Sequence, residues 1–325
     1  MSGAQEPTPA VRKLLELFNR AGSPPPLHLG TVASARELVD ASVNALQAPA
    51  ADVARVEDLD IPVPHGSVPA RVFHPSPGDR LPMVVYLHGG GWTTGDLDTV
   101  DRPCRLLASR ASVVVVALDY RLSPEAPFPA ALDDCTQAWG WLAQHRDDLG
   151  ADERFIAVVG DSAGGNLAAA LVIRTAGGLG PAPDAVALLY PPLEPSIGSP
   201  HPSYVENAEN PVLPRDTMAW FWSQYVRDDS DYHLPTVCPP RADDLSYFPP
   251  TLVVTAGLDV LRDEGRAFAE RLRAEGVEVT HREFVGVTHG FLWMDRMIPS
   301  ALDLVDLVGA FINAGHEKQG IDKAG

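Results

Sequence analysis

Short, nearly continuous apolar runs alternate with helix-length amphipathic stretches through most of this 325-residue sequence. Strand candidates lie at 68–73, 83–87, 113–118, 155–159, 185–190, 251–255 and 277–284, and several of them are such continuous apolar runs. The helical patterns lie at 99–110, 130–144, 163–175, 263–275 and 299–314. Apolar runs without polar alternation are typical of parallel strands buried on both faces, and parallel strands need crossover helices of this length. The sequence therefore predicts an α/β fold with a mostly parallel central sheet and helices on both faces.

Two segments depart from this alternation. Amphipathic helices are predicted at about 8–18 and 34–46, before any strand, so they cannot be crossovers of the sheet. The proline-rich segment 191–250, with a helix near 215–226, separates two core strands and is too long for an ordinary loop. We expect these two segments to form a helical cap.

The sequence thus divides into five parts. The expected parts are N-terminal cap helices at 1–50, a first core part at 51–190, a cap insertion at 191–250, a second core part at 251–314, and a disordered tail at 315–325. The tail is expected because its residues are polar and include glycine.

The charge balance argues against several kinds of partner. The sequence has 43 acidic and 25 basic residues, a formal net charge of −18. Such a chain repels nucleic-acid phosphates and anionic lipid headgroups, so we expect no nucleic-acid binding. The first residues lack the apolar stretch of an export signal, and no apolar run reaches the ~18 residues of a membrane span. We expect a soluble, cytoplasmic protein without stable membrane insertion.

The cysteines give no sign of a disulfide framework. Cys104, Cys135 and Cys238 are odd in number, lie far apart in the sequence and form no C-x-x-C pair. We expect three reduced thiols rather than a disulfide or a metal site.

The stretch "GDSAGGN" at 160–166 follows an apolar run and opens a predicted helix. It fits G-x-S-x-G, the strained strand-to-helix turn that holds a nucleophilic serine above the end of a sheet. Glycines flank such a serine because side chains there would clash. The motif alone is common by chance, but its position between a strand and a helix makes Ser162 a candidate nucleophile.

A serine nucleophile needs a general base and an orienting acid, in the chain order Ser, Asp or Glu, His for this kind of turn. Asp259 and His289 follow predicted strands in that order, where sites gather at strand carboxyl ends. Asp259 is preferred to Asp263, which falls inside a helix and suits its first turn. His281 lies within a strand and is a poorer candidate for the base than His289.

The stretch "HGGGW" at 88–92 follows another strand. Consecutive glycines let backbone N–H groups approach a substrate oxygen closely, and no lysine of a phosphate-binding loop is nearby. We expect Gly89 and Gly90, with Ala163 at the helix start, to form an oxyanion hole. His88 is expected to shape this loop by hydrogen bonding.

Several aromatic residues are candidates for the substrate pocket. Trp92 beside the glycine loop and Trp220 and Phe221 in the insertion could form its walls. An aromatic stripe at helical spacing is more often part of a core. Asp161 could face the pocket mouth or anchor a neighbouring loop, and we favour the anchoring role.

Further motifs support a family resemblance. These motifs are "YRLSPE" at 120–125, "PFPA" at 128–131, "LDVLRDEG" at 258–265 and "VTHGF" at 287–291. Together with "HGGGW" and "GDSAGGN", they resemble the bacterial hormone-sensitive-lipase-like carboxylesterases, a branch of the α/β-hydrolase fold, across about 59–312. Val260 stands where the family often has proline.

The resemblance implies a serine carboxylesterase with Ser162 as nucleophile, His289 as base and Asp259 as acid. It implies no cofactor and no metal, a small ester with a short acyl chain as substrate, and a homodimer through the sheet edge. An amidase, formamide hydrolase or lactonase would use the same triad, so these alternatives stay open. A non-catalytic protein that binds a small ligand is a further alternative, although binding alone would not require all three residues.

Overall fold

The computed structural model describes residues 5–20, 23–196 and 198–322. Its centre is an eight-stranded sheet in the order β1-β2-β4-β3-β5-β6-β7-β8. The strands are β1 (Arg55–Val63), β2 (Gly66–His74), β3 (Leu81–Leu87), β4 (Val114–Leu118), β5 (Ala151–Asp161), β6 (Ala185–Leu189), β7 (Thr251–Leu258) and β8 (Val279–Thr288). Pairing is antiparallel between β1 and β2 and between β2 and β4, and parallel elsewhere. The predicted, mostly parallel sheet is confirmed.

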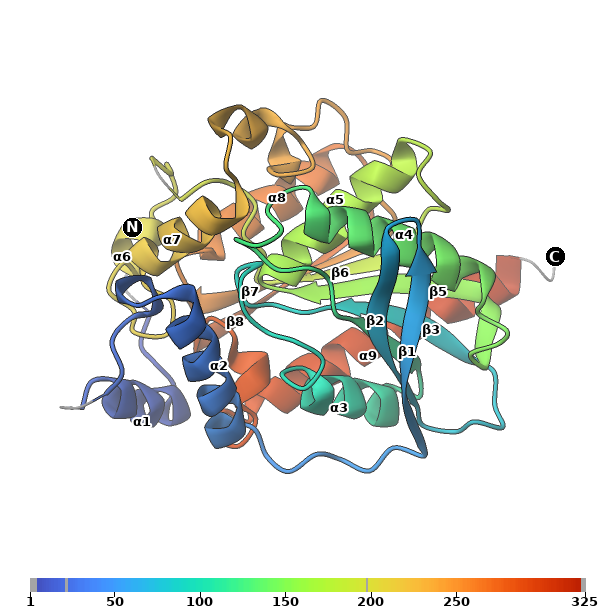
Figure 1. The fold of residues 1–325 in the computed structure, drawn as a ribbon, viewed down its shortest axis with the longest axis horizontal. Helices are drawn as coiled ribbons and strands as arrows, with labels where there is room; N and C mark the ends of the chain where they lie inside the picture. The colour runs from blue at the N-terminus through green and yellow to red at the C-terminus, as the bar shows by residue number, and fades with distance from the viewer. Residues whose placement is uncertain (1–4, 21–22, 197, 323–325) are drawn as a thin grey trace.

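Helices cover both faces of this sheet (Figure 1). The helices α3 (Asp101–Ala111) and α9 (Ser300–Asp322) lie on one face, and α4 (Ala130–Gln144), α5 (Ala163–Ala176) and α8 (Arg262–Ala274) lie on the other. Within β3, Met83, Val85 and Leu87 pack into one core and Val84 and Tyr86 into the other. Both sides of a central strand are therefore buried, which explains its uninterrupted apolar sequence.

The edge strand β1 is absent from the predicted strands. Charged residues interrupt its sequence, and Ile61 alone among its residues is buried. It pairs only with β2, as one arm of an antiparallel hairpin with an exposed face. A search for continuous apolar runs misses such a strand because antiparallel edge strands need to bury only part of their surface.

The N-terminal helices and the insertion meet at one end of the sheet. Figure 1 shows α1 (Pro9–Phe18) and α2 (Val32–Leu46), drawn in blue, near α6 (Ser203–Glu206) and α7 (Arg215–Tyr225), drawn in yellow. His28, in the short turn η1 (Leu27–Leu29), hydrogen-bonds through Nδ1 to Thr217 Oγ1 of α7 at 2.8 Å. Two segments distant in sequence therefore contact each other directly above the core.

The final helix is longer than expected. Residues 315–325 are expected to form a disordered tail, but α9 continues to Asp322. His316 Nε2 hydrogen-bonds to Asp152 Oδ2 at 2.9 Å and its ring lies against Phe155, while Lys318 pairs with Glu278 at 2.6 Å. These tertiary contacts hold a polar segment whose composition alone suggests disorder. Within the described ranges, every helix is too short or too polar to cross a membrane.

A buried ion pair attaches the segment after α2 to the core. Arg102 of α3 donates through Nε and Nη2 to Asp295 Oδ2, at 3.0 and 2.7 Å. Asp295 also accepts from the backbone N–H of Ala48, and Arg102 donates to the carbonyl of Pro49. The side chains of Asp295 and Arg102 are 2% and 14% exposed, so removal of the carboxylate would leave a largely buried guanidinium without its counter-charge.

We expect Asp295→Ala to lower the free energy of unfolding by about 3 kcal/mol or more, because breaking a buried ion pair leaves one charge uncompensated. Asp306→Ala is the matched control, since the Asp306–Arg110 pair lies half exposed on the surface. The control should cost less than about 1 kcal/mol. Urea unfolding of both variants measures the difference, and equal losses would contradict the role given to Asp295.

Candidate active site

Ser162 lies in a strained turn between β5 and α5. Its backbone has φ 52° and ψ −122°, a left-handed conformation that a residue with a side chain adopts at a cost. A Cβ on Gly164 would lie 1.9 Å from the carbonyl oxygen of Leu87, and a Cβ on Gly160 would lie 2.1 Å from that of Gly164. Only glycine fits at these two positions, as the G-x-S-x-G motif predicts.

Two loops bring an imidazole and a carboxylate to this serine. His289 directly follows β8, and Asp259 directly follows β7. His289 Nε2 lies 2.9 Å from Ser162 Oγ, and His289 Nδ1 lies 2.7 Å from Asp259 Oδ2. Asp259 is almost completely buried and also accepts from the N–H of Leu261. A proton on Nδ1, donated to Asp259, leaves Nε2 free to accept from the serine hydroxyl.

The alternative acid, Asp263, and the alternative base, His281, make contacts with other residues and not with Ser162. Asp263, in α8, pairs with Arg266 at 2.8 Å and accepts from the backbone N–H of Ser203. His281, within β8, hydrogen-bonds to Thr255 Oγ1 at 3.0 Å. The structure therefore brings Asp259 and His289, and not Asp263 or His281, to the candidate nucleophile.

One of the N–H groups expected to form the oxyanion hole is already occupied in the glycine loop. The N–H of Gly89 already donates to Asp161 Oδ1 at 3.0 Å, so it is not free for a substrate oxygen. The N–H groups of Gly90, Gly91 and Ala163 have no acceptor in the part of the chain that the structure describes. Gly90 and Gly91 have φ values of 110° and 59°, which favour glycine. The glycines of this loop with a free N–H group are therefore Gly90 and Gly91. The spacing of the motif alone does not show whether Gly89 or Gly91 has the free N–H group.

Asp161 connects the nucleophile turn to the glycine loop. Its Oδ1 accepts from the hydroxyl of Tyr86 at 2.8 Å as well as from Gly89. Burial raises the pKa of Asp161 to about 6, although these two hydrogen bonds act in the opposite direction. The contacts correspond to the anchoring role favoured for this residue.

His88 supports the same loop from inside the core. Its Nδ1 lies 2.7 Å from the carbonyl of Gly89, and its ring stacks on Tyr120 with centroids 4.2 Å apart. The Tyr120 hydroxyl donates to the His88 carbonyl at 2.6 Å. Burial lowers the pKa of His88 to about 4, so the ring is neutral at physiological pH. His88 therefore positions the loop.

A cavity of about 690 Å³ opens beside Ser162 and His289. Gly90 and Gly91 reach it from the core, and most of its wall comes from α1, α2 and the insertion. The larger apolar residues that line the cavity are Leu14, Leu17, Phe18, Leu27, Leu38, Val39, Val43, Leu46, Val212, Leu213, Met218, Phe221, Trp293 and Met294. The candidate nucleophile thus faces a mostly apolar space large enough for a small organic ligand.

The three candidate pocket aromatics lie in different places. Phe221 lines the cavity, where its ring occupies the position that a Cβ on Gly91 would take. Trp92 is completely buried and stacks on Tyr225 at 4.3 Å, so it belongs to the core. Trp220 lies beside Phe221, and neither tryptophan is among the described residues that line the cavity. The environment of Trp92 is therefore that of a core residue and not that of a pocket wall.

We expect Asp161→Asn to change how stability depends on pH. Folded Asp161 holds its proton up to about pH 6, whereas an unfolded aspartic acid loses it near pH 4. The wild-type protein therefore loses stability through this group as the pH rises across that interval. Asparagine does not titrate and keeps an oxygen acceptor for Tyr86 and Gly89.

The free energy of unfolding of Asp161→Asn, relative to wild type, should therefore rise by about 3 kcal/mol between about pH 4 and pH 6. Urea unfolding of both proteins across this range measures it. Parallel stability curves would show that Asp161 is ionised throughout.

Comparison with known proteins places this geometry in a family. A family model of the alpha/beta hydrolase fold matches residues 84–293. The chain is 43% identical over 245 residues to the carboxylic ester hydrolase LipN of Mycobacterium tuberculosis, covering 73% of this chain and 64% of that protein. It is 34% identical over 297 residues to an ethyl acetate hydrolase of Pseudomonas putida, covering 90% and 93%.

Solved structures agree with these sequence relatives. A hyperthermophilic esterase from the archaeon Pyrobaculum calidifontis superposes with a TM-score of 0.89 at 39% identity, covering 95% of this chain and 98% of that one. These relatives thus resemble the chain in sequence over most of its length and, in the solved structure, in fold as well. The chain therefore belongs to the hormone-sensitive-lipase-like carboxylesterases of the α/β-hydrolase fold, the family that its sequence motifs indicate.

Proposed function

We propose that this protein is a serine carboxylesterase that hydrolyses small-molecule esters with short acyl chains. The observation that carries the proposal is the continuous hydrogen-bonded series from Ser162 Oγ through His289 to Asp259, open to an apolar cavity. The name of the ethyl acetate hydrolase, which aligns with 90% of this chain, supports a short acyl group.

In the first step, Ser162 Oγ attacks the ester carbonyl carbon while His289 Nε2 takes the hydroxyl proton. The new C–O bond converts the carbonyl to a tetrahedral oxyanion. Asp259, 2.7 Å from His289 Nδ1, holds the imidazole in the required tautomer and stabilises the imidazolium that forms. Burial of Asp259 strengthens this interaction because water does not screen it.

We assign the oxyanion to the N–H groups of Gly90, Gly91 and Ala163, and no longer to that of Gly89. The three groups have no acceptor within the described residues, whereas Gly89 donates to Asp161. Ala163 also begins α5, so the positive end of the helix dipole acts on the same charge. Loss of one such donor typically costs about 3 kcal/mol of transition-state stabilisation.

Collapse of the tetrahedral intermediate breaks the bond to the alcohol oxygen, which takes the proton from His289 Nε2 and leaves. The product is an acyl-enzyme on Ser162. Water then attacks the acyl carbon as His289 removes one of its protons. A second collapse returns that proton to Ser162 Oγ and releases the carboxylic acid.

We expect turnover of p-nitrophenyl esters from acetyl to palmitoyl to peak at short chains. Ser162→Ala and His289→Ala should lower kcat by about 10⁵-fold or more, and Asp259→Asn by about 10⁴-fold, because each removes a member of one proton-transfer unit. Initial rates measured on the ester series test this directly.

Matched aryl amides serve as the comparison for substrate class. Faster turnover of an amide than of the corresponding ester would move the assignment to amide hydrolysis. Wild-type-like turnover by Ser162→Ala would eliminate the mechanism.

Phe221→Ala should shift the preferred acyl chain towards longer esters, because the ring fills the space beside Gly91 at the cavity wall. Trp220→Ala is the control, since Trp220 is the adjacent aromatic on α7 and does not line the cavity. The ratio of kcat/KM for octanoyl and butyryl esters measures the shift. Identical ratios in the two variants would remove Phe221 from the substrate pocket.

A further inference from the structure

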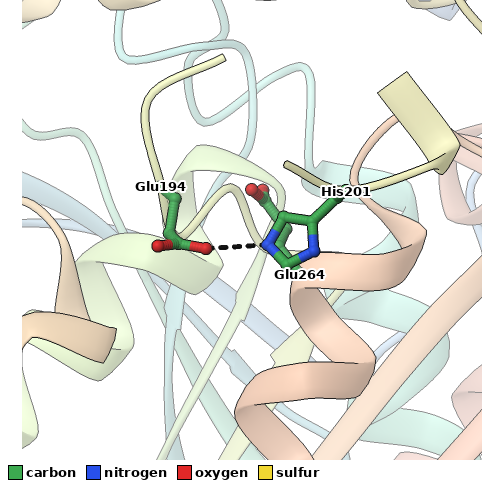
Figure 2. A group of neighbouring side chains, drawn as sticks. All are labelled: Glu194, His201 and Glu264. Atoms are coloured by element: carbon green, nitrogen blue, oxygen red, sulfur yellow. Dashed lines mark hydrogen bonds and ion pairs between the residues drawn. The ribbon is translucent and has the colours of Figure 1, made fainter. Parts of the chain in front are cut away.

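Three potential metal ligands from separate segments meet beside the core (Figure 2). Glu194 follows β6, His201 precedes α6, and Glu264 lies in the first turn of α8. One ligand atom from each residue lies within 4.8 Å of the other two. His201 Nε2 and Glu194 Oε2 are 2.7 Å apart.

Glu264 has an unsatisfied oxygen in this cluster. The residue is 1% exposed, and its Oε1 accepts from the backbone N–H of Leu193 at 3.0 Å. Its Oε2 is buried without a hydrogen-bond partner among the described residues. The side-chain charges that act on Glu264 most strongly are those of Glu194 and Asp259, and both are carboxylates. The hydroxyl of Tyr204, which also lacks a partner among the described residues, is a neighbouring side-chain donor that acts on Glu264. No cationic side chain is among the charges that act on Glu264 most strongly, so a bound cation would stabilise the ionised carboxylate.

The donor set selects among metal ions. Two carboxylate oxygens and one imidazole nitrogen suit Zn²⁺ and similar divalent transition metals, whereas Mg²⁺ and Ca²⁺ prefer oxygen ligands alone. Glu194 and His201 keep 31% and 15% of their side-chain surface exposed. An ion can therefore enter from the solvent, and water can complete a four-coordinate shell.

We propose that Glu194, His201 and Glu264 bind one divalent transition-metal ion, best matched by Zn²⁺, as a structural site. Binding replaces the Glu194–His201 hydrogen bond, and His201 offers the Nε2 lone pair while Nδ1 carries the ring proton. No metal is expected in ester hydrolysis, and this ion takes no part in it. The site does not depend on the proposed esterase activity.

The position of the site gives the ion a defined mechanical role. Ser203 Oγ donates to the Val260 carbonyl at 2.6 Å, and Asn207 Nδ2 donates to the Asp259 carbonyl at 3.0 Å. These bonds already hold the segment around α6 to the loop of the catalytic acid. The insertion also contacts α8 directly, through the N–H of Ser203 to Asp263 and the N–H of Leu193 to Glu264. A metal that joins Glu194 and His201 to Glu264 would add a further attachment between the insertion and α8.

The test is calorimetric titration of the full-length, chelator-treated protein with ZnCl₂. The expected result is one Zn²⁺ bound per chain, together with a higher thermal unfolding midpoint. His201→Gln, which preserves hydrogen bonding to Glu194, should weaken binding by at least about 10-fold. The variant should also lose the visible absorption band that Co²⁺ gives when it replaces Zn²⁺ at a protein site.

His316→Gln is the matched control. His316 pairs with Asp152 at 2.9 Å, much as His201 pairs with Glu194, but outside any three-ligand cluster of the described residues. The control should keep wild-type affinity. If His201→Gln does not fold, as judged by circular dichroism, Glu194→Gln at the more exposed ligand provides the same comparison. Absence of stoichiometric binding to wild type, or equal losses in the cluster and control variants, would overturn the proposal.

Discussion

The close contact between the start of α5 and the end of β3 is the constraint on which the active site depends. Gly164 lies so near the Leu87 carbonyl that no side chain fits between them. This contact brings the turn that holds Ser162 against the glycine loop that follows β3. Asp161 then connects the two by accepting from Gly89. The proposed nucleophile and the proposed oxyanion donors are thus held in position by the sheet itself, before substrate binds.

Much of this arrangement is predictable because it rests on local rules. Parallel strands buried on both faces have uninterrupted apolar sequences, and their carboxyl ends meet at one edge of the sheet. The positions of Ser162, Asp259 and His289 at strand ends follow from that geometry. Short loops after these strands are then enough to bring the three side chains within hydrogen-bonding distance of one another.

The features that escaped prediction depend on tertiary contacts. Motif spacing does not reveal which glycine N–H is occupied, because the acceptor, Asp161, lies 72 residues further along the chain. Trp92 is adjacent to the glycine loop in sequence, yet it stacks on Tyr225 of the distant insertion. The helical end of α9 depends on contacts such as that between His316 and Asp152. In each case one partner is too remote for a local pattern to identify.

The contact between Phe221 and Gly91 joins the insertion to the oxyanion loop without any intervening residue. This contact limits the exchange of caps among related hydrolases. A chimera that receives a foreign insertion acquires a different residue against Gly91. A graft intended to alter substrate range would therefore also disturb the N–H groups to which we assign the oxyanion. Recombination between such enzymes should therefore succeed most often when the insertion and the glycine loop are inherited together.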